Sequence, residues 1–185
     1  MRALIVNNGT KDPTALTEAF PNAEVISWNK LKEVNLANFD LAVLSGSSNF
    51  PVMGNESELA KELELIRLSP IPVLGICYGF ELIVVAFGGT LKMLPHKENG
   101  VLELTVEGAD PVFDGIDKLI VYEGHRWIAD SIPESLIPLA KSPHGIEAVR
   151  HKDRLIYGFQ FHPEKHLNET VGRRILDNFV SLAGF

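Results

Sequence analysis

Short apolar runs alternate with amphipathic segments through the first half of the chain. The apolar runs predict strands over residues 3–6, 24–27, 41–44 and 71–76. The run at 71–76 is apolar at nearly every position, which is typical of a central parallel strand buried on both faces. Because strands that alternate with helices build a mostly parallel sheet, this half of the chain predicts an α/β fold.

Helical periodicity and capping signals mark the segments between these strands. Asp12-Pro13 has the pattern of an N-cap followed by a proline in the first helical turn. Residues 55–58 read Asn-Glu-Ser-Glu, which resembles a capping box before a helix over residues 59–66. A further apolar helix is expected from residue 78 onward, and it should stop at Gly88-Gly89.

Strand signals dominate residues 90 to 160. Strands are predicted over residues 102–106, 119–122, 146–150 and 155–161. A final amphipathic helix over residues 171–182 follows, with Asn168 as its candidate N-cap. We therefore expect an open, mostly parallel α/β sheet with helices on both faces and a strand-rich second half, in one domain over residues 1–185.

Composition and charge narrow the setting of this fold. The 185 residues are 45% hydrophobic and 22% charged, as in an ordinary soluble globule. A net charge of -7 argues against a basic nucleic-acid-binding face. No apolar run reaches the roughly 18 residues of a membrane helix, and the N-terminal run is too short for a signal peptide. A single cysteine fits a reducing compartment, so we expect a cytoplasmic protein without nucleic-acid or membrane partners.

That cysteine, Cys77, lies between Gly75 and Gly79, where a predicted strand turns into a predicted helix. A free thiol is mostly protonated at neutral pH, and only the thiolate attacks well. The positive end of the helix dipole would favour the thiolate, and the glycines would permit a tight turn. The pattern resembles the nucleophile elbow of serine hydrolases, although free cysteines are also common as small buried hydrophobic residues.

A candidate base lies far downstream. His162 follows the carboxyl end of a predicted strand, which is where open α/β sheets bind ligands. Glu164, two residues on, can reach the imidazole, fix its tautomer and stabilise the imidazolium. A surface His-Glu pair is the alternative for these two residues alone. Together with Cys77 they predict a nucleophile, a general base and an orienting carboxylate.

A loop of small residues, Ser-Gly-Ser-Ser-Asn at 45–49, follows the predicted strand at 41–44. Such a loop can aim backbone N–H groups at a developing oxyanion. The N–H groups of Ser47 and Tyr78 are the candidate donors. Taken by itself the segment could equally be an ordinary loop.

Together these segments resemble the class I glutamine amidotransferases over essentially the whole chain. Members share a G-x-C-x-G-x-Q elbow and a Q-F-H-P-E segment, and here residues 75–81 read GICYGFE and residues 160–164 read QFHPE. The resemblance implies a flavodoxin-like domain in which Cys77 forms a glutamyl thioester, with His162 as general acid and base and Glu164 as its orienting partner. Ammonia would leave first, and water would then cleave the thioester.

Three departures from the family pattern concern the substrate. Glu81 replaces a glutamine that helps to hold the substrate; a carboxylate can accept hydrogen bonds there, but when ionised it would repel the substrate α-carboxylate. Ser47-Ser48 stand where Gly-Gly or Gly-Pro is common. Residues 123–127, Glu-Gly-His-Arg-Trp, align with a region whose backbone grips the α-carboxylate, and a structural role for His125 is equally open. The expected substrate-binding residues are Gly46, Glu81, His125, Arg126 and Trp127.

The sequence also predicts what the chain lacks. It has no phosphate-binding loop, no ATP pyrophosphatase motif and no Cys/His spacing typical of a metal site, so we expect no cofactor and no metal. The chain would then perform only the hydrolytic half-reaction and pass ammonia to a partner synthase.

Which member of the family this is stays open at the level of sequence. Residues 147–152, 157–164 and 172–179 resemble the separate glutaminase subunits of GMP synthase, an enzyme of purine biosynthesis, and of anthranilate synthase. Phe80-Glu81 is instead similar to the γ-glutamyl hydrolases. Three functions remain: the glutaminase of a two-chain synthase, a stand-alone γ-glutamyl hydrolase, and a non-catalytic binding member of the fold.

Overall fold

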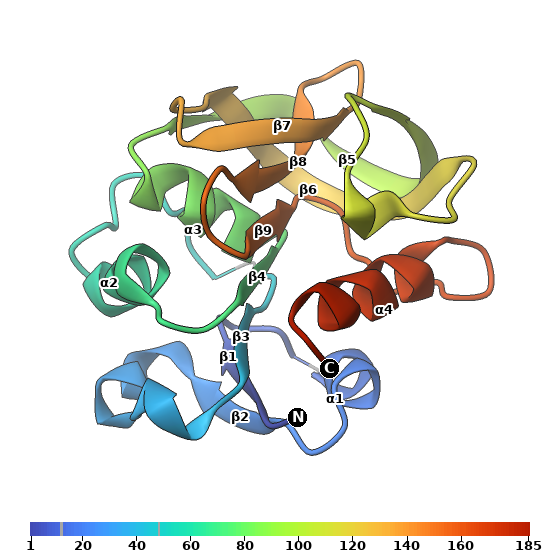
Figure 1. The fold of residues 1–185 in the computed structure, drawn as a ribbon. Helices are drawn as coiled ribbons and strands as arrows, with labels where there is room; N and C mark the ends of the chain where they lie inside the picture. The colour runs from blue at the N-terminus through green and yellow to red at the C-terminus, as the bar shows by residue number, and fades with distance from the viewer. Residues whose placement is uncertain (12, 48) are drawn as a thin grey trace.

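The computed structural model of the protein describes residues 1–11, 13–47 and 49–185. The candidate cap Asp12 and Ser48 of the 45–49 loop lie outside the described residues. Within the described ranges the chain forms a nine-stranded sheet with the strand order β2-β1-β3-β4-β9-β8-β7-β5-β6, flanked by helices (Figure 1).

The first part of the sheet is parallel. Its strands are β2 (Glu24–Ser27), β1 (Ala3–Asn7), β3 (Leu41–Leu44), β4 (Val73–Ile76) and β9 (Ile156–Phe159). Every residue of β3, β4 and β9 is buried, as their apolar runs predict, whereas β2 at the edge of the sheet is largely exposed. The predicted strands of the first half are confirmed.

The second part of the sheet is antiparallel. It contains β8 (Ile146–His151), β7 (Leu136–Lys141), β5 (Thr90–Val106) and β6 (Leu119–Ser131). The sequence predicts β8 but only the last part of β5 and the first part of β6, and it does not predict β7. Most side chains of β5 are exposed or half-buried, so no apolar run marks its length. The expected α/β class with a strand-rich second half is confirmed as one mixed open sheet.

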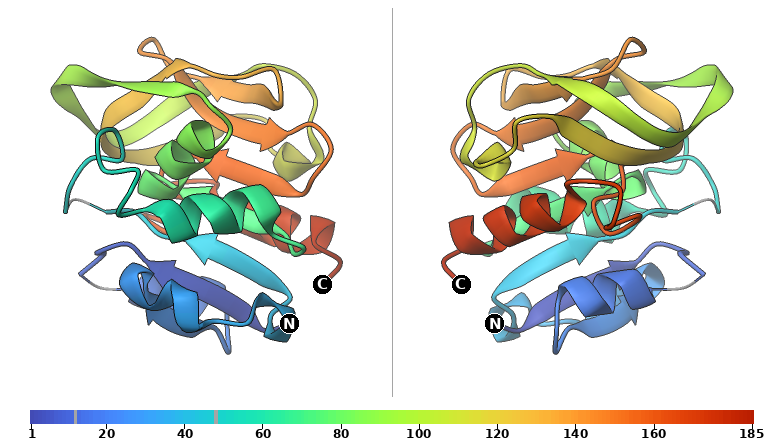
Figure 2. Two further views of the ribbon diagram at one scale, coloured as in Figure 1. Left: turned by 90° about the vertical axis from the view of Figure 1, so that its left-hand side faces the viewer. Right: turned by 90° about the vertical axis from the view of Figure 1, so that its right-hand side faces the viewer.

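Helices cover both faces of the parallel strands (Figures 1 and 2). One face carries α1 (Thr14–Ala19) and α4 (Gly172–Leu182), and the other carries α2 (Ala60–Leu68) and α3 (Tyr78–Ala86). Alternate residues of one strand serve the two cores: Ile5 packs with Phe179 of α4, while Leu4 and Val6 belong to the cluster that includes Ile66 of α2. Among the helices that the structure describes, none is both long and apolar enough to cross a membrane.

Short 3-10 helices complete the described fold. They are η1 (Trp28–Glu33), η2 (Leu36–Asn38) and η3 (Pro111–Phe113). The predicted end of α3 is confirmed: Gly88 has φ +94°, its N–H donates to the Val85 oxygen (3.0 Å), and the Gly89 N–H donates to the Val84 oxygen (2.9 Å). This pair of bonds satisfies the last carbonyls of the helix in a Schellman arrangement.

Two predicted helix caps are wrong, although both helices begin within one residue of the predicted bounds. The capping box at 55–58 does not form, because the two backbone N–H groups that it would satisfy have other partners: the Asn55 N–H donates to the Val52 carbonyl oxygen (3.1 Å) and the Glu58 N–H to the Asn55 carbonyl oxygen (3.1 Å). The Asn55 side chain donates to the Pro51 carbonyl oxygen (2.9 Å), and α2 begins at Ala60. Asn168 does not cap α4 either: the N-cap is Val171, whose N–H donates to the Ile120 oxygen of β6 (2.9 Å).

Candidate functional site

Cys77 occupies the sharp turn between β4 and α3. It is a non-glycine residue in the left-handed region, with φ 53° and ψ −100°, and its N–H donates to the Phe159 oxygen of β9 (2.7 Å). Strained backbone of this kind persists only where the surroundings enforce it. A Cβ at Gly75 would collide with the Gly79 carbonyl, and one at Gly79 would collide with the Leu44 carbonyl. The two glycines are therefore needed for strand and helix to meet closely enough to form this elbow.

His162 and Glu164 lie just beyond β9. The Nδ1 atom of His162 is 2.8 Å from Glu164 Oε1, and both side chains are buried. The backbone N–H of His162 also donates to the backbone carbonyl oxygen of Tyr122 in β6 (2.8 Å). This bond ties the turn to the antiparallel part of the sheet. With Nδ1 engaged by the carboxylate, Nε2 is the ring nitrogen left to exchange a proton.

Glycines on two sides leave room for the His162 ring. A Cβ at Gly46 would lie 3.0 Å from Cε1 of His162 and 3.6 Å from Cβ of Cys77. One at Gly124 would lie 3.5 Å from Nε2 of His162. Gly46 thus sits between the thiol residue and the imidazole, and the structure brings Cys77, His162 and Glu164 together as the sequence predicts.

Burial and nearby charge favour the protonated form of the Cys77 thiol. Burial raises its pKa well above the ordinary value, and the carboxylates of Glu81 and Glu164 raise it further. The backbone N–H of Tyr78 lowers it, but this is the weakest of the influences. The predicted activation by the helix N-terminus is therefore outweighed by burial, and a base must remove the proton when the thiol reacts.

The candidate oxyanion donors lie beside the thiol. Tyr78 is the first residue of α3, and its N–H faces the sulfur. Ser47 lines the same cavity as Cys77. The start of the loop is anchored to the end of β1, since the Asn8 N–H donates to Ser45 Oγ (2.9 Å) and Asn8 Nδ2 donates to the Ser45 carbonyl (3.1 Å). Neither Asn8 nor Ser45 was singled out from the sequence.

Two cavities flank Cys77. The larger, about 380 Å³, is lined by Ser47, Asn49, Phe50, Pro51, Cys77, Tyr78, Glu81, Lys97, Gly124, His125, Arg126 and Trp127. A second cavity of about 190 Å³ is lined by residues that include Gly46, His162, Lys97 and Lys165. Every predicted site residue lines one of these two cavities except Glu164, which lies behind the imidazole. Lys97 and Lys165 are additions that sequence motifs did not mark.

Glu81 is buried next to the thiol at the start of α3. Burial raises its pKa to about 7, while a hydrogen bond from Gln160 and the charge of His125 partly offset this. Gln160 also points its Nε2 at Cys77 Sγ, at 3.9 Å. When protonated, the Glu81 carboxyl is uncharged and offers both a donor and an acceptor, as a glutamine amide does, although the amide has two N–H donors and the carboxyl a single O–H. The expected repulsion of a substrate carboxylate then disappears.

The predicted pocket residues of β6 point in different directions. Arg126 donates from Nε to the Leu94 oxygen (3.2 Å) and from its guanidinium to the Pro95 oxygen (3.3 Å), so β5 carbonyls position its charge at the cavity rim. His125 points inward: its Nδ1 contacts the Trp127 oxygen (3.0 Å), and its Nε2 faces Glu123 and Glu147. Both ring nitrogens of His125 therefore face protein atoms. This favours the structural role for the residue over direct contact with a substrate.

Comparison with known proteins agrees with this geometry. The glutamine amidotransferase class-I family matches residues 3–182, and the chain belongs to that family. The fold is the one that the family resemblance implied.

Its relatives include subunits of glutamine-hydrolysing GMP synthases. The one from Methanococcus vannielii is 38% identical over 98% of this chain and 97% of that protein. The one from Methanothermobacter thermautotrophicus is 31% identical over 88% of this chain and 84% of that protein. The GMP synthase of Thermosipho africanus is 36% identical over 86% of this chain, but the match spans only 31% of that longer protein.

Solved structures show the same fold. A Thermoplasma acidophilum protein, provisionally designated as one subunit of a GMP synthase, superimposes with a TM-score of 0.88 at 25% identity, over 100% of this chain and 94% of that one. A glutamine amidotransferase from Thermotoga maritima superimposes with a TM-score of 0.73 at 20% identity, over 100% of this chain and 82% of that one.

Proposed function

We propose that this protein is the glutaminase subunit of a two-subunit GMP synthase, and that it supplies ammonia to a separate synthetase subunit. The observation that carries the proposal is the buried His162–Glu164 pair, 2.8 Å apart, beside a strained cysteine elbow. Relatives that match over most of their own length are subunits of glutamine-hydrolysing GMP synthases. We further infer that residues 1–185 act as one domain in a reducing cytosol, where Cys77 stays a thiol.

Thioester formation follows from the geometry. Nε2 of His162 takes the Cys77 proton as the sulfur attacks the γ-carboxamide carbon of glutamine, while Glu164 stabilises the imidazolium. The negative charge that develops on the amide oxygen is stabilised by the N–H groups of Ser47 and Tyr78. The imidazolium then gives its proton to the departing nitrogen, ammonia leaves, and a glutamyl thioester remains on Cys77.

Hydrolysis reverses the roles of the same groups. His162 takes a proton from a water molecule, whose oxygen attacks the thioester carbonyl. The tetrahedral intermediate expels the sulfur, which regains a proton from His162, and glutamate is released. Because burial disfavours the thiolate, the proposal assigns removal of the thiol proton to His162.

The substrate would occupy the larger cavity. Arg126, held at the rim by β5 carbonyls, supplies positive charge for the α-carboxylate, and Trp127 forms a wall. Glu81 takes the place of the family's glutamine and acts in its protonated form. A different γ-glutamyl amide is the second candidate substrate, because Glu81 departs from the family pattern.

The test is to measure glutamate release from glutamine, with and without the synthetase subunit of a GMP synthase, using Cys77→Ser as the control. We expect Cys77-dependent release that rises when the synthetase subunit is present. The absence of Cys77-dependent glutamate under every condition would contradict the glutaminase proposal. A panel of γ-glutamyl amides separates the second candidate: cleavage of those amides but not of glutamine would favour a γ-glutamyl hydrolase.

A further inference from the structure

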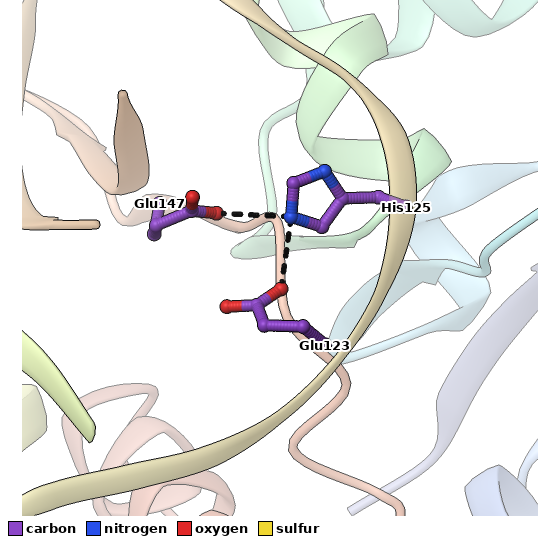
Figure 3. A group of neighbouring side chains, drawn as sticks. All are labelled: Glu123, His125 and Glu147. Carbon is purple, nitrogen blue, oxygen red and sulfur yellow. Dashed lines mark ion pairs between the residues drawn. The ribbon is translucent and has the colours of Figure 1, made fainter. Parts of the chain in front are cut away.

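A second set of ionisable side chains lies in the antiparallel part of the sheet. Glu123 and His125 are two positions apart on β6 and therefore share one face of the strand, and Glu147 of β8 lies opposite them (Figure 3). The three side chains are at most 1% exposed. We call them the Glu123–His125–Glu147 cluster.

The cluster points three ligand atoms at one place. His125 Nε2 lies 3.0 Å from Glu123 Oε2 and 3.4 Å from Glu147 Oε2, and the candidate ligand atoms all lie within 4.8 Å of one another. Nitrogen and oxygen ligands at roughly 2.0–2.1 Å from a tetrahedral cation would be about 3.3 Å apart. The separations from Nε2 are close to that spacing.

These contacts lack the geometry of hydrogen bonds. Among the described residues, His125 Nε2, Glu147 Oε2 and both carboxylate oxygens of Glu123 have no hydrogen-bond partner, although each is buried. Buried polar atoms without partners are costly and call for an explanation such as an ion. The two oxygens flank the ring nitrogen instead of lying along its N–H direction.

The outer contacts orient the cluster toward its centre. His125 Nδ1 lies 3.0 Å from the Trp127 oxygen, and Ser142 Oγ donates to Glu147 Oε1 at 2.6 Å. Metal-binding histidines generally donate their second ring N–H to an oxygen in this way, and ligating carboxylates are likewise hydrogen-bonded on the outside. With Nδ1 as the donor, Nε2 of the neutral ring would present its lone pair to a cation held between the two carboxylates.

A cation would also balance the charge of the cluster. Two ionised glutamates with a neutral histidine carry a formal charge of about −2, which one divalent cation would neutralise in this buried site. In the part of the chain that the structure describes, the ion pairs of Glu123 and Glu147 involve His125 alone. The neighbouring Arg126 directs its guanidinium to β5 carbonyls instead.

We propose that Glu123, His125 and Glu147 bind one divalent transition cation, such as Zn²⁺ or Mn²⁺, through Nε2 and an oxygen of each carboxylate. Imidazole and carboxylate ligands suit these ions. The cation would hold β6 to β8 directly behind the segment that lines the larger cavity. The site differs from the absence of metal expected from sequence, and it does not depend on the glutaminase proposal.

Metal binding to the full chain tests the proposal. The protein is stripped with a chelator and titrated with Zn²⁺ or Mn²⁺ by calorimetry, and bound metal is counted by mass spectrometry. We expect about one equivalent in the wild type and in Cys77→Ser, which excludes binding through the thiol. Glu147→Gln should weaken binding by at least about tenfold. His144→Asn, which removes the half-exposed His144–Glu98 pair, is the matched control and should bind normally.

A spectroscopic measurement avoids reliance on a variant that fails to fold. X-ray absorption of the zinc-loaded wild type should show only nitrogen and oxygen neighbours at about 2.0–2.1 Å. A sulfur neighbour at about 2.3 Å would place the ion on Cys77 and overturn the proposal. So would the absence of stoichiometric binding, or binding by a folded Glu147→Gln protein that equals the wild type.

Discussion

His162 and His125 are both buried beside glutamates, yet their ring nitrogens are used differently. Glu164 engages Nδ1 of His162, and glycines leave space around the other edge of the ring, toward Cys77. His125 has Nδ1 at a backbone oxygen and Nε2 between two carboxylates. A histidine can act as a base only where one nitrogen stays available to the reacting atom. Residue type and burial alone therefore do not distinguish the two sites.

The largest expected effect is the loss of the available nitrogen. His162→Gln should lower kcat for glutamine hydrolysis by about 10³-fold or more, because it removes the base proposed to take the buried thiol's proton. His125→Gln is the matched comparison and should keep a larger share of kcat. The measurement is steady-state glutamate release; equal losses in the two variants would remove the functional distinction between these histidines.

The second effect concerns folding and has the opposite ranking. Removing the His125 ring takes one ligand from the proposed cation site and leaves two buried carboxylates poorly compensated, so His125→Gln should lower the free energy of unfolding by about 3 kcal/mol. His162→Gln should lower it by less, since it leaves only one carboxylate, Glu164, without its partner, and Glu164 lines a separate cavity of about 340 Å³. Urea denaturation of the two variants measures both free energies of unfolding. A reversed order would mean that the Glu123–His125–Glu147 cluster does not stabilise the fold.

A smaller effect tests the space around His162. Gly46→Ala places a methyl group 3.0 Å from the imidazole, and the resulting displacement of Cys77 or His162 should lower kcat by about 10- to 100-fold. Gly124→Ala, whose methyl would lie 3.4 Å from the same ring, should have a weaker effect. Kinetic assays of both variants give the order of their kcat values. An unchanged kcat in Gly46→Ala would show that the imidazole can move freely.

The smallest effect is a pH dependence from Glu81, whose folded-state pKa is raised to about 7. A raised carboxyl pKa contributes stability below its unfolded value near 4.5, and this stability is lost as the pH rises through about 7. Glu81→Gln should therefore gain stability relative to the wild type between about pH 4.5 and 7. It should also remove a severalfold rise in KM for glutamine above pH 7. The measurements are the free energy of unfolding and KM as functions of pH, for Glu81→Gln and for the wild type. Profiles that do not differ between the two proteins would contradict a proton on Glu81.

Local signals predict the elements whose residues are buried on both faces. The runs at 41–44 and 71–76 correspond to β3 and β4, because continuous burial leaves a continuous apolar run. The strands β5 and β7 are missed or shortened, since many of their side chains are exposed or half-buried and no continuous apolar run marks them. The Asn168 cap fails for a different reason: a contact with β6 sets the start of α4.

The catalytic candidates are accessible from sequence, and the second cluster is not. Cys77 lies in a glycine-flanked strand-helix junction, and His162 with Glu164 forms one short motif. Glu123 and His125 do alternate on one strand, which marks a shared face, but nothing local joins them to Glu147. Their meeting depends on how β6 lies against β8, which are not neighbours in the strand order.

Apolar runs and short motifs are local properties of the chain, so the sequence was enough to establish the parallel core and to predict the elbow at Cys77 with its candidate base and carboxylate. The folded sheet was needed to show which histidine keeps a usable nitrogen, that burial disfavours the thiolate, and that Glu147 joins Glu123 and His125. Hydrogen-bond partners, desolvation and charge neighbours depend on contacts between distant strands, and these contacts exist only once the sheet has formed.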